Sequence, residues 1–249
     1  MSDNLPIIRP SNLPVVAEKL AGRSLQAESR ILHFPDYAVG VLKFVQPSAS
    51  LLGCLIYRDG VPAQGNVVVP PGQLLVWKCA SLGASELASF RSVNLSALAG
   101  LCVAVHADGT RFDQDDLAEI AKLKGLRFLN LSRTTVTDKS LRHLNGLSKL
   151  EWLDLSGTKL KGDGLDALPQ VTSLGLSNTS ITDSGLQHMS RLTRLESVHL
   201  RETQISDDGL RLLIGLSRLS YLDLRGTHVT AGGVAYLRQQ IPDLRIAKP

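Results

Sequence analysis

Two pairs of residues have the types and the spacing for acid–base chemistry or for metal binding. His106 and Asp108 form a His-x-Asp sequence on one predicted strand, and His199 and Asp223 are predicted to face each other across neighbouring strands. A metal or catalytic site needs a third ligand or a nucleophile, and the sequence offers none beside either pair. Phosphate-binding glycine loops, His-Glu-x-x-His and Gly-x-Ser-x-Gly are absent from the sequence as well. We therefore expect a non-enzymatic protein with no metal and no cofactor.

An aromatic pair is a candidate for binding a partner. Only 4% of the residues are aromatic, yet Phe128 and Trp152 are 24 residues apart, which is one period of the repeat described below. That spacing predicts adjacent positions on two paired strands, about 5 Å apart. If both rings are exposed, they have the character of an interface hot spot. The alternative is that one or both pack against a neighbouring loop and serve the fold.

A second candidate cluster is charged. Arg201 and Arg225 are predicted on neighbouring strands, where two guanidinium groups could clamp a carboxylate or a phosphate. The alternative, which is slightly favoured, is that Arg201, Arg225, Glu202 and Asp223 neutralise one another on a solvated face. Between the aromatic pair and this cluster the fourth repeat is small and polar, and it could admit a protruding loop of a partner. The predicted partner-binding residues are Phe128, Asn130, Trp152, Asp154, His199, Arg201, Tyr221, Asp223 and Arg225.

These side chains are positioned by a repeat. Six segments begin with an apolar residue or a cysteine at intervals of 24, 24, 21, 24 and 24 residues, and these leading positions are Cys102, Leu126, Leu150, Val171, Leu195 and Leu219. Apolar residues follow three and five positions later, as Leu153 and Leu155 do in the third repeat. Side chains alternate along a strand, so Leu153 and Leu155 would point to one face and Trp152 and Asp154 to the other. A period of roughly 20–29 residues with this pattern indicates an α/β leucine-rich repeat solenoid, which we expect to be right-handed.

The strands of about six such repeats would pair into a parallel, concave sheet. We use the name concave face for the sheet face opposite the leucine core. Helices would return the chain between strands, and a hydroxyl followed by an acid predicts their starts at Thr137-Asp138, Thr182-Asp183 and Ser206-Asp207. Thr230-Ala231 keeps the cap without the acid, and Lys161-Gly162 keeps neither.

A threonine recurs eight residues after each leading position, and these residues are Thr110, Thr134, Thr158, Thr179, Thr203 and Thr227. The chain turns there as it leaves the strand, and backbone groups in such a turn would be buried without partners. A small hydroxyl can bond to some of them. We interpret this threonine ladder as structural.

The repeat resembles a known family. Residues 171–186 read Val-Thr-Ser-Leu-Gly-Leu-Ser-Asn-Thr-Ser-Ile-Thr-Asp-Ser-Gly-Leu, which is similar to the leucine-rich repeats of the ribonuclease-inhibitor-like superfamily. The subtype that it resembles occurs beside F-boxes and in many bacterial proteins. The resemblance covers roughly residues 102–249 and implies ligand binding, usually of proteins. The chain departs from the subtype in having Thr where Cys or Asn is frequent, and we find no F-box-like helical segment ahead of the repeats.

Residues 1–101 do not repeat. We predict a helix over 11–22, strands over 30–34, 39–45, 51–57, 66–69 and 74–78, and a hairpin over 67–76. This β-rich region would cap the open end of the solenoid at 102–249, where a terminal repeat otherwise exposes its apolar interior. The alternative is an independent module that binds a small molecule or catalyses a reaction, with the repeats choosing its target.

Composition sets further limits. The net charge of +4 is divided evenly between 1–101 and 102–249, so the sequence indicates no basic cluster of the kind that binds nucleic acid. Cys54, Cys79 and Cys102 are odd in number and widely spaced, which argues against disulfides or a zinc site and favours reduced thiols. We find no signal peptide and no apolar run long enough to span a membrane. We expect a cytoplasmic protein that binds a partner protein as scaffold, adaptor or effector, and that binds neither nucleic acid nor membrane.

Overall fold

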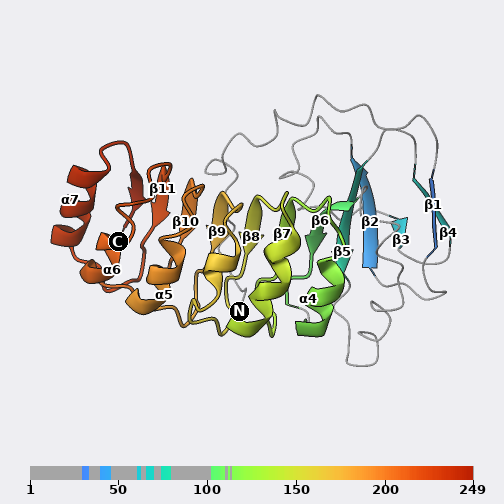
Figure 1. Cartoon of the computed structure of the whole chain (residues 1–249), viewed down its shortest axis with the longest axis horizontal. Coiled ribbons are helices and arrows are strands. Elements are labelled where there is room, and N and C mark those ends of the chain that lie inside the picture. The colour runs from blue at the N-terminus through green and yellow to red at the C-terminus, as the bar shows by residue number, and fades with distance from the viewer. Residues whose placement is uncertain are drawn as a thin grey trace, which may run out of the picture.

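The computed structural model describes residues 30–33, 40–45, 61–62, 66–69, 74–79, 102–109, 112 and 114–248. Its main element is a ten-stranded sheet, in which the strands from β5 to β12 are parallel neighbours in chain order. The strands of this parallel part are β5 (Leu74–Cys79), β6 (Cys102–His106), β7 (Phe128–Asn130), β8 (Trp152–Asp154), β9 (Ser173–Gly175), β10 (Ser197–His199), β11 (Tyr221–Asp223) and β12 (Arg245–Ala247). Figure 1 shows them side by side along the long axis of the molecule.

One helical segment connects each pair of consecutive strands from β6 onward. The six segments are α4 (Gln114–Ile120), η3 (Asp138–Gly146), η4 (Leu165–Ala167), α5 (Asp183–Met189), α6 (Asp207–Arg211) and α7 (Ala231–Gln240), where η3 and η4 are 3-10 helices. This strand–helix unit confirms the α/β repeat solenoid that the period predicts. We number its repeats 1 to 6, and they cover 102–125, 126–149, 150–170, 171–194, 195–218 and 219–243.

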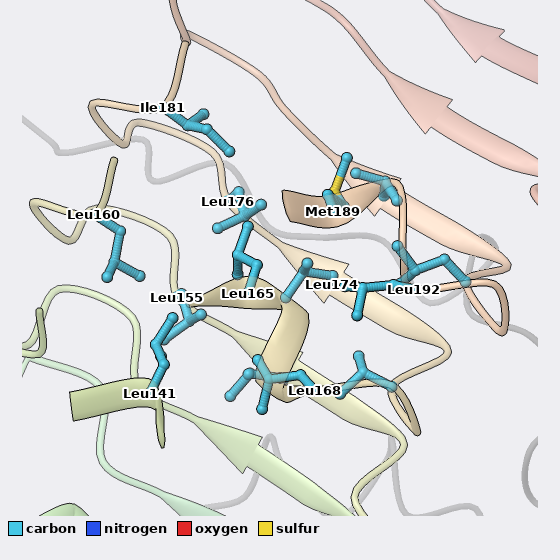
Figure 2. Close-up of a cluster of buried hydrophobic side chains, with 14 of the residues drawn as sticks. Leu141, Leu155, Leu160, Leu165, Leu168, Leu174, Leu176, Ile181, Met189 and Leu192 are labelled. Atoms are coloured by element: carbon cyan, nitrogen blue, oxygen red, sulfur yellow. The ribbon is translucent and has the colours of Figure 1, made fainter. Parts of the chain in front are cut away.

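The leucine pattern forms one continuous core. Leu150, Leu153 and Leu155 of repeat 3 are all 0% exposed, and the equivalent residues of repeats 2, 4 and 5 are equally buried. The helices add a second set, such as Leu165 and Leu168, which pack against the neighbouring repeats in Figure 2. Each buried leucine contributes roughly 2 kcal/mol of hydrophobic stabilisation, so the stacking of repeats is the main source of stability.

Five threonines of the ladder make the same hydrogen bond. Each hydroxyl donates to the backbone carbonyl three residues earlier at 2.6–2.7 Å, and the pairs are Thr134–Leu131, Thr158–Leu155, Thr179–Leu176, Thr203–Leu200 and Thr227–Leu224. The residue before each of these threonines has a left-handed backbone, including the non-glycine residues Arg133 (φ 55°), Asn178 (φ 56°) and Glu202 (φ 55°). Each of these hydroxyls therefore bonds to a carbonyl at a sharp corner of the chain. Thr110 lies outside the described residues.

The helix starts lie where the capping pairs predict them. Thr137, Thr182, Ser206 and Thr230 are the N-cap residues of η3, α5, α6 and α7. The Ser206 hydroxyl accepts the Asp208 N–H at 3.3 Å and the Thr230 hydroxyl accepts the Gly233 N–H at 3.2 Å. At Thr137 the cap is a capping box, in which the Ser140 hydroxyl accepts the Thr137 N–H at 3.0 Å. Repeat 3, which lacks both cap and acid, has the shortest helical segment, the three residues of η4.

The acids after these caps connect one repeat to the next, which sequence reasoning missed. The Asp183 carboxylate accepts the Ser206 N–H at 2.9 Å and its hydroxyl at 2.5 Å. Asp207 accepts the same two groups of Thr230 at 2.8 and 2.6 Å. Asp138 accepts the backbone N–H groups of Lys161 and Gly162. We refer to each of these three carboxylates as an aspartate staple.

The described strands ahead of the repeats form two groups. β2 (Gly40–Val45) pairs antiparallel with β5 and with β3 (Val61–Pro62), so the ten-stranded sheet runs across the boundary at residue 101. β1 (Arg30–His33) pairs antiparallel with β4 (Asn66–Val69) in a separate two-stranded sheet. The predicted hairpin over 67–76 is therefore wrong, because β4 and β5 pair with different strands. The predicted helix over 11–22 and strand over 51–57 lie outside the described residues.

Candidate functional site

The parallel register sets the side chains of the concave face in rows. Phe128, Trp152, Ser173, Ser197 and Tyr221 are aligned from strand to strand, and we refer to them as the aromatic row. A second row aligns Asn130, Asp154, Gly175, His199 and Asp223. Alternation along short strands thus aligns seven of the nine predicted residues in two rows.

The two aromatic residues of the predicted pair differ in exposure. Phe128 and Trp152 are register partners on β7 and β8, as their spacing predicts. Trp152 is partly exposed, whereas Phe128 exposes only 7% of its surface. The condition that both rings are exposed is therefore not met by Phe128.

The acidic and amide side chains of the second row bond to their own strand ends. Asn130 accepts the Ser132 N–H at 2.9 Å, Asp154 accepts the Ser156 N–H at 2.9 Å, and Asp223 accepts the Arg225 N–H at 3.2 Å. This is the local bond by which Asx residues stabilise a turn. The predicted binding residues Asn130, Asp154 and Asp223 thus have a fold-forming role at the end of each strand.

The small size of the fourth repeat has a packing cause. A Cβ on Gly175 would lie 2.9 Å from the Asp154 Cγ and 3.2 Å from the Ser156 Oγ, so the neighbouring repeat already fills that space. Ser173 and Ser197, in the aromatic row, are only 2% and 1% exposed. The backbone of β9 therefore offers little open surface to a protruding loop.

The charged cluster of repeats 5 and 6 is neutralised within itself. Arg225 donates to both Asp223 oxygens, at 2.9 and 2.6 Å, and the Arg201 Nε lies 3.6 Å from the Glu202 carboxylate. Burial raises the pKa of Asp223, but the hydrogen bonds from Arg225 outweigh it and hold the pKa below the ordinary 3.8. This pairing is the alternative that the sequence favours, and it leaves Arg225 half-exposed beside a buried carboxylate.

His199 lies among groups that resemble parts of a catalytic site. Its Nε2 is 3.5 Å from the Ser197 Oγ, its ring centroid is 5.2 Å from that of Tyr221, and Asp223 is its register partner. Burial lowers the pKa of His199 from the ordinary 6.5, although Asp223 acts in the opposite direction. The Ser197 residue is 1% exposed, and Arg225 occupies both oxygens of Asp223. The burial of Ser197 and the bonds of Asp223 to Arg225 do not favour an arrangement of nucleophile, base and orienting acid.

Asp108 of the other predicted pair bonds to the next repeat. Asp108 accepts hydrogen bonds from Arg133 Nε at 2.9 Å and from the Ser132 hydroxyl at 2.8 Å, both in the next repeat. The side-chain surroundings of His106 lie outside what the structure describes. In the described part of the chain, no three His, Cys, Asp or Glu side chains gather as a metal site would require.

The comparisons with known proteins bear on the fold. No known protein family matches the sequence, and no curated protein matches it. Among solved structures, internalin C2 of Listeria monocytogenes is 20% identical with a TM-score of 0.51, over 70% of this chain and 80% of the internalin. The likeness to internalin C2 is one of fold, that of a leucine-rich repeat protein.

Two further structures have TM-scores below 0.5. An internalin F of the same species is 23% identical with a TM-score of 0.49, over 66% of this chain. A leucine-rich repeat protein of Leptospira interrogans is 18% identical with a TM-score of 0.47, over 61% of this chain. The chain spans 44% of the length of each of these two proteins.

Of the helices that the structure describes, none combines the length and the apolar character needed to cross a membrane.

Proposed function

We propose that the chain is a non-enzymatic protein-recognition module, which binds a partner protein through the concave face as a scaffold, adaptor or effector. The observation that carries this proposal is the aromatic row, in which the parallel strands hold Trp152 and Tyr221 in register with both side chains partly exposed. A rigid sheet presents such side chains already ordered, so little conformational entropy is lost on binding. Aromatic side chains also dominate the energy of many interfaces.

The polar residues around the aromatic row support the same proposal. Asn130, His199 and Arg201 are partly exposed and Arg225 is exposed, so a partner could reach them. The ring of His199 lies against that of Tyr221, which fixes the orientation of both. The buried members Phe128, Asp154 and Asp223 would act by shaping this surface, because their own exposed fractions are 7%, 4% and 2%.

A paired-variant capture experiment tests the proposal. We expect Trp152→Ala/Tyr221→Ala to lose a partner that the wild type captures from lysate of the source organism, with at least about a 30-fold loss of affinity for two hot-spot side chains. The matched control is Tyr236→Ala, an aromatic residue that is 42% exposed on α7. Both variants should melt at the wild-type temperature, which shows that the solenoid is intact. Equal capture by the two variants would contradict the proposal.

The N-terminal region is proposed as the cap of this solenoid. Its support is the parallel pairing of β5 with β6 and the antiparallel pairing of β5 with β2, which extend the repeat sheet toward the N-terminus. The second candidate is an independent small-molecule-binding or catalytic module within 1–101. It would fold by itself, whereas a cap whose strands complete the sheet of the repeats would not.

Two finer assignments belong to the same proposal. The repeat subtype is that found beside F-boxes and in bacterial proteins, which is supported by the Thr-Asp-x-Gly-Leu sequence of repeat 4. A cytoplasmic location is supported by three cysteines with no pairing pattern.

A further inference from the structure

Cations that are scattered through the sequence are brought together by the repeat. Lys149, Arg194 and Arg218 each stand immediately before the leading residue of a repeat, and Lys124 stands two residues before Leu126. The strands that follow them, β7, β8, β10 and β11, are parallel, so the starts of these strands meet at one edge of the sheet. An even distribution of charge along the chain thus becomes a line of charge along the solenoid.

The four side chains of this line are exposed and available. None of them forms an ion pair with another described residue, and Lys124 makes only a 3.4 Å hydrogen bond to the Gly146 carbonyl. We refer to Lys124, Lys149, Arg194 and Arg218 as the basic edge. Gln170 occupies the corresponding position of repeat 4, where it is 9% exposed, so the line has one gap.

The acids near the basic edge do not neutralise it. Glu151 is engaged by the Arg127 Nη2, which donates to its two oxygens at 2.7 and 2.6 Å. Of the other acids there, Glu196 is partly buried and Asp243 stands one repeat beyond Arg218. The four cations of the basic edge are therefore not paired with a carboxylate in the described part of the chain.

We propose that the basic edge binds an extended acidic segment of a partner protein. Lys124 and Arg218 are four strand positions apart, which at about 4.8 Å per strand gives a line of roughly 19 Å. An extended polypeptide rises about 3.3 Å per residue, so about six residues cover that length. Glutamate or aspartate side chains on such a segment would meet the cations of successive repeats.

The chemistry of the edge favours carboxylates over nucleic acid. Proteins that bind single-stranded nucleic acid combine cations with aromatic side chains on which the bases stack. The turns that carry the basic edge, residues 121–125, 145–149, 190–194 and 214–218, hold no aromatic residue. A line of cations without a stacking surface suits a flexible acidic polypeptide.

Binding of a labelled peptide to the full chain tests this inference. The probe is an oligo-glutamate of about ten residues, long enough to cover the line at about 3.3 Å per residue. We expect binding at low ionic strength that weakens as salt is added, because exposed charges are screened. The variant Lys149→Glu/Arg194→Glu/Arg218→Glu should lose at least about tenfold in affinity.

The control variant carries the same change of net charge elsewhere. Lys139→Glu/Lys159→Glu/Lys161→Glu reverses three exposed lysines that do not belong to the basic edge, and it should retain most of the affinity. If charge reversal unfolds the first variant, the neutral variant Lys149→Gln/Arg194→Gln/Arg218→Gln answers the same question. An equal loss in the control, or no binding by the wild type, would overturn the inference. Tighter binding of oligo-thymidine than of oligo-glutamate would also overturn it, in favour of nucleic acid.

The inference stands apart from the proposed recognition by the concave face. Trp152→Ala/Tyr221→Ala leaves the basic edge intact and should bind oligo-glutamate as the wild type does. The two proposals can therefore fail separately. If oligo-glutamate does not bind while a partner is still captured through the concave face, the inference about the basic edge has failed. If the peptide binds but Trp152→Ala/Tyr221→Ala still captures the partner, the proposed recognition by the concave face has failed.

Discussion

The junction between repeats 3 and 4 and the junction between repeats 5 and 6 solve the same packing problem in different ways. At the junction of repeats 5 and 6 the Asp207 carboxylate fills the space between the coils, and Gly233 leaves room for it. At the junction of repeats 3 and 4 no aspartate staple is present, although Asp166 lies 3.4 Å from Arg191 across it. Gly162 stands in the place of the staple, and the backbones of Gly162 and Gly185 lie directly against each other.

The staples account for the presence of glycine in the Thr-Asp-x-Gly-Leu pattern. A Cβ on Gly209 would lie 2.9 Å from the Asp183 Cγ, and a Cβ on Gly233 would lie 3.1 Å from the Asp207 Oδ2. Each glycine therefore leaves room for the acid of the preceding repeat, and not for the acid two residues before it in its own repeat. Repeat 6 illustrates this, because it keeps Gly233 although Ala231 has replaced its own acid.

The largest expected effect concerns the junction without a staple. A Cβ on Gly185 would overlap the Lys161 carbonyl oxygen and lie 2.7 Å from the Ile181 Cγ1 and 3.2 Å from the Gly162 Cα. Because backbone atoms cannot move aside as a side chain does, Gly185→Ala should lower the free energy of unfolding by about 2–3 kcal/mol. This exceeds the gain of about 1 kcal/mol from the better helix propensity of alanine. Urea unfolding followed by circular dichroism measures it.

A matched glycine provides the control for that variant. A Cβ on Gly215 would meet nothing within 4 Å, so Gly215→Ala should leave the urea midpoint close to that of the wild type. A similar loss of stability in both variants would mean that the close contact at Gly185 is not the cause.

A double-mutant cycle sharpens the contrast at the stapled junction. Gly233→Ala should cost about 1–2 kcal/mol in the wild type, because its Cβ collides with the Asp207 carboxylate. In an Asp207→Ala background the carboxylate is gone, so the same change should cost much less. Unfolding free energies of the four proteins should give a coupling of about 1 kcal/mol. Additive costs would show that acid and glycine do not act as a pair.

The staples show where sequence reasoning stops. The capping pairs predict the helix starts at Thr182 and Ser206 because an N-cap is a local property of the chain. The partner of Asp183 is 23 residues away in the next repeat. The effect of an acid on the helix dipole concerns only its own helix, so it does not predict this contact. The signal was nevertheless present, since Asp in one repeat and Gly in the next occur together in repeats 4 to 6.

The concave face shows the same limit. Alternation placed Phe128 and Trp152 on one face in register, because the period of a strand is fixed by geometry. It could not give their exposed fractions, which depend on how all the neighbouring side chains pack. It also could not show that Asn130 and Asp154 bond to their own strand ends. The same side-chain oxygen of an Asn or Asp can accept a local backbone N–H or a group of a ligand.

The smallest expected effect is a difference in acid sensitivity between the two kinds of junction. Hydrogen bonds from the Thr230 hydroxyl and N–H lower the pKa of Asp207 below the ordinary 3.8, so its charged form stabilises the fold. That contribution is present above about pH 3.8 and is lost as the pH falls through the folded pKa. Asp207→Asn keeps an acceptor that does not titrate, so the advantage of the wild type over this variant should shrink between pH 6 and pH 3 in urea unfolding.

Two comparisons decide whether this loss belongs to the staple. Asp243→Asn changes an exposed acid that forms no ion pair with another described residue, and it is the matched Asp-to-Asn control. Amide hydrogen exchange at Thr230 should become faster in acid relative to exchange at Gly185, where backbones are in contact and no aspartate staple accepts the hydrogen bonds. If the two amides respond alike, acid weakens the solenoid as a whole. The staple then makes no separate contribution to the stability of its junction.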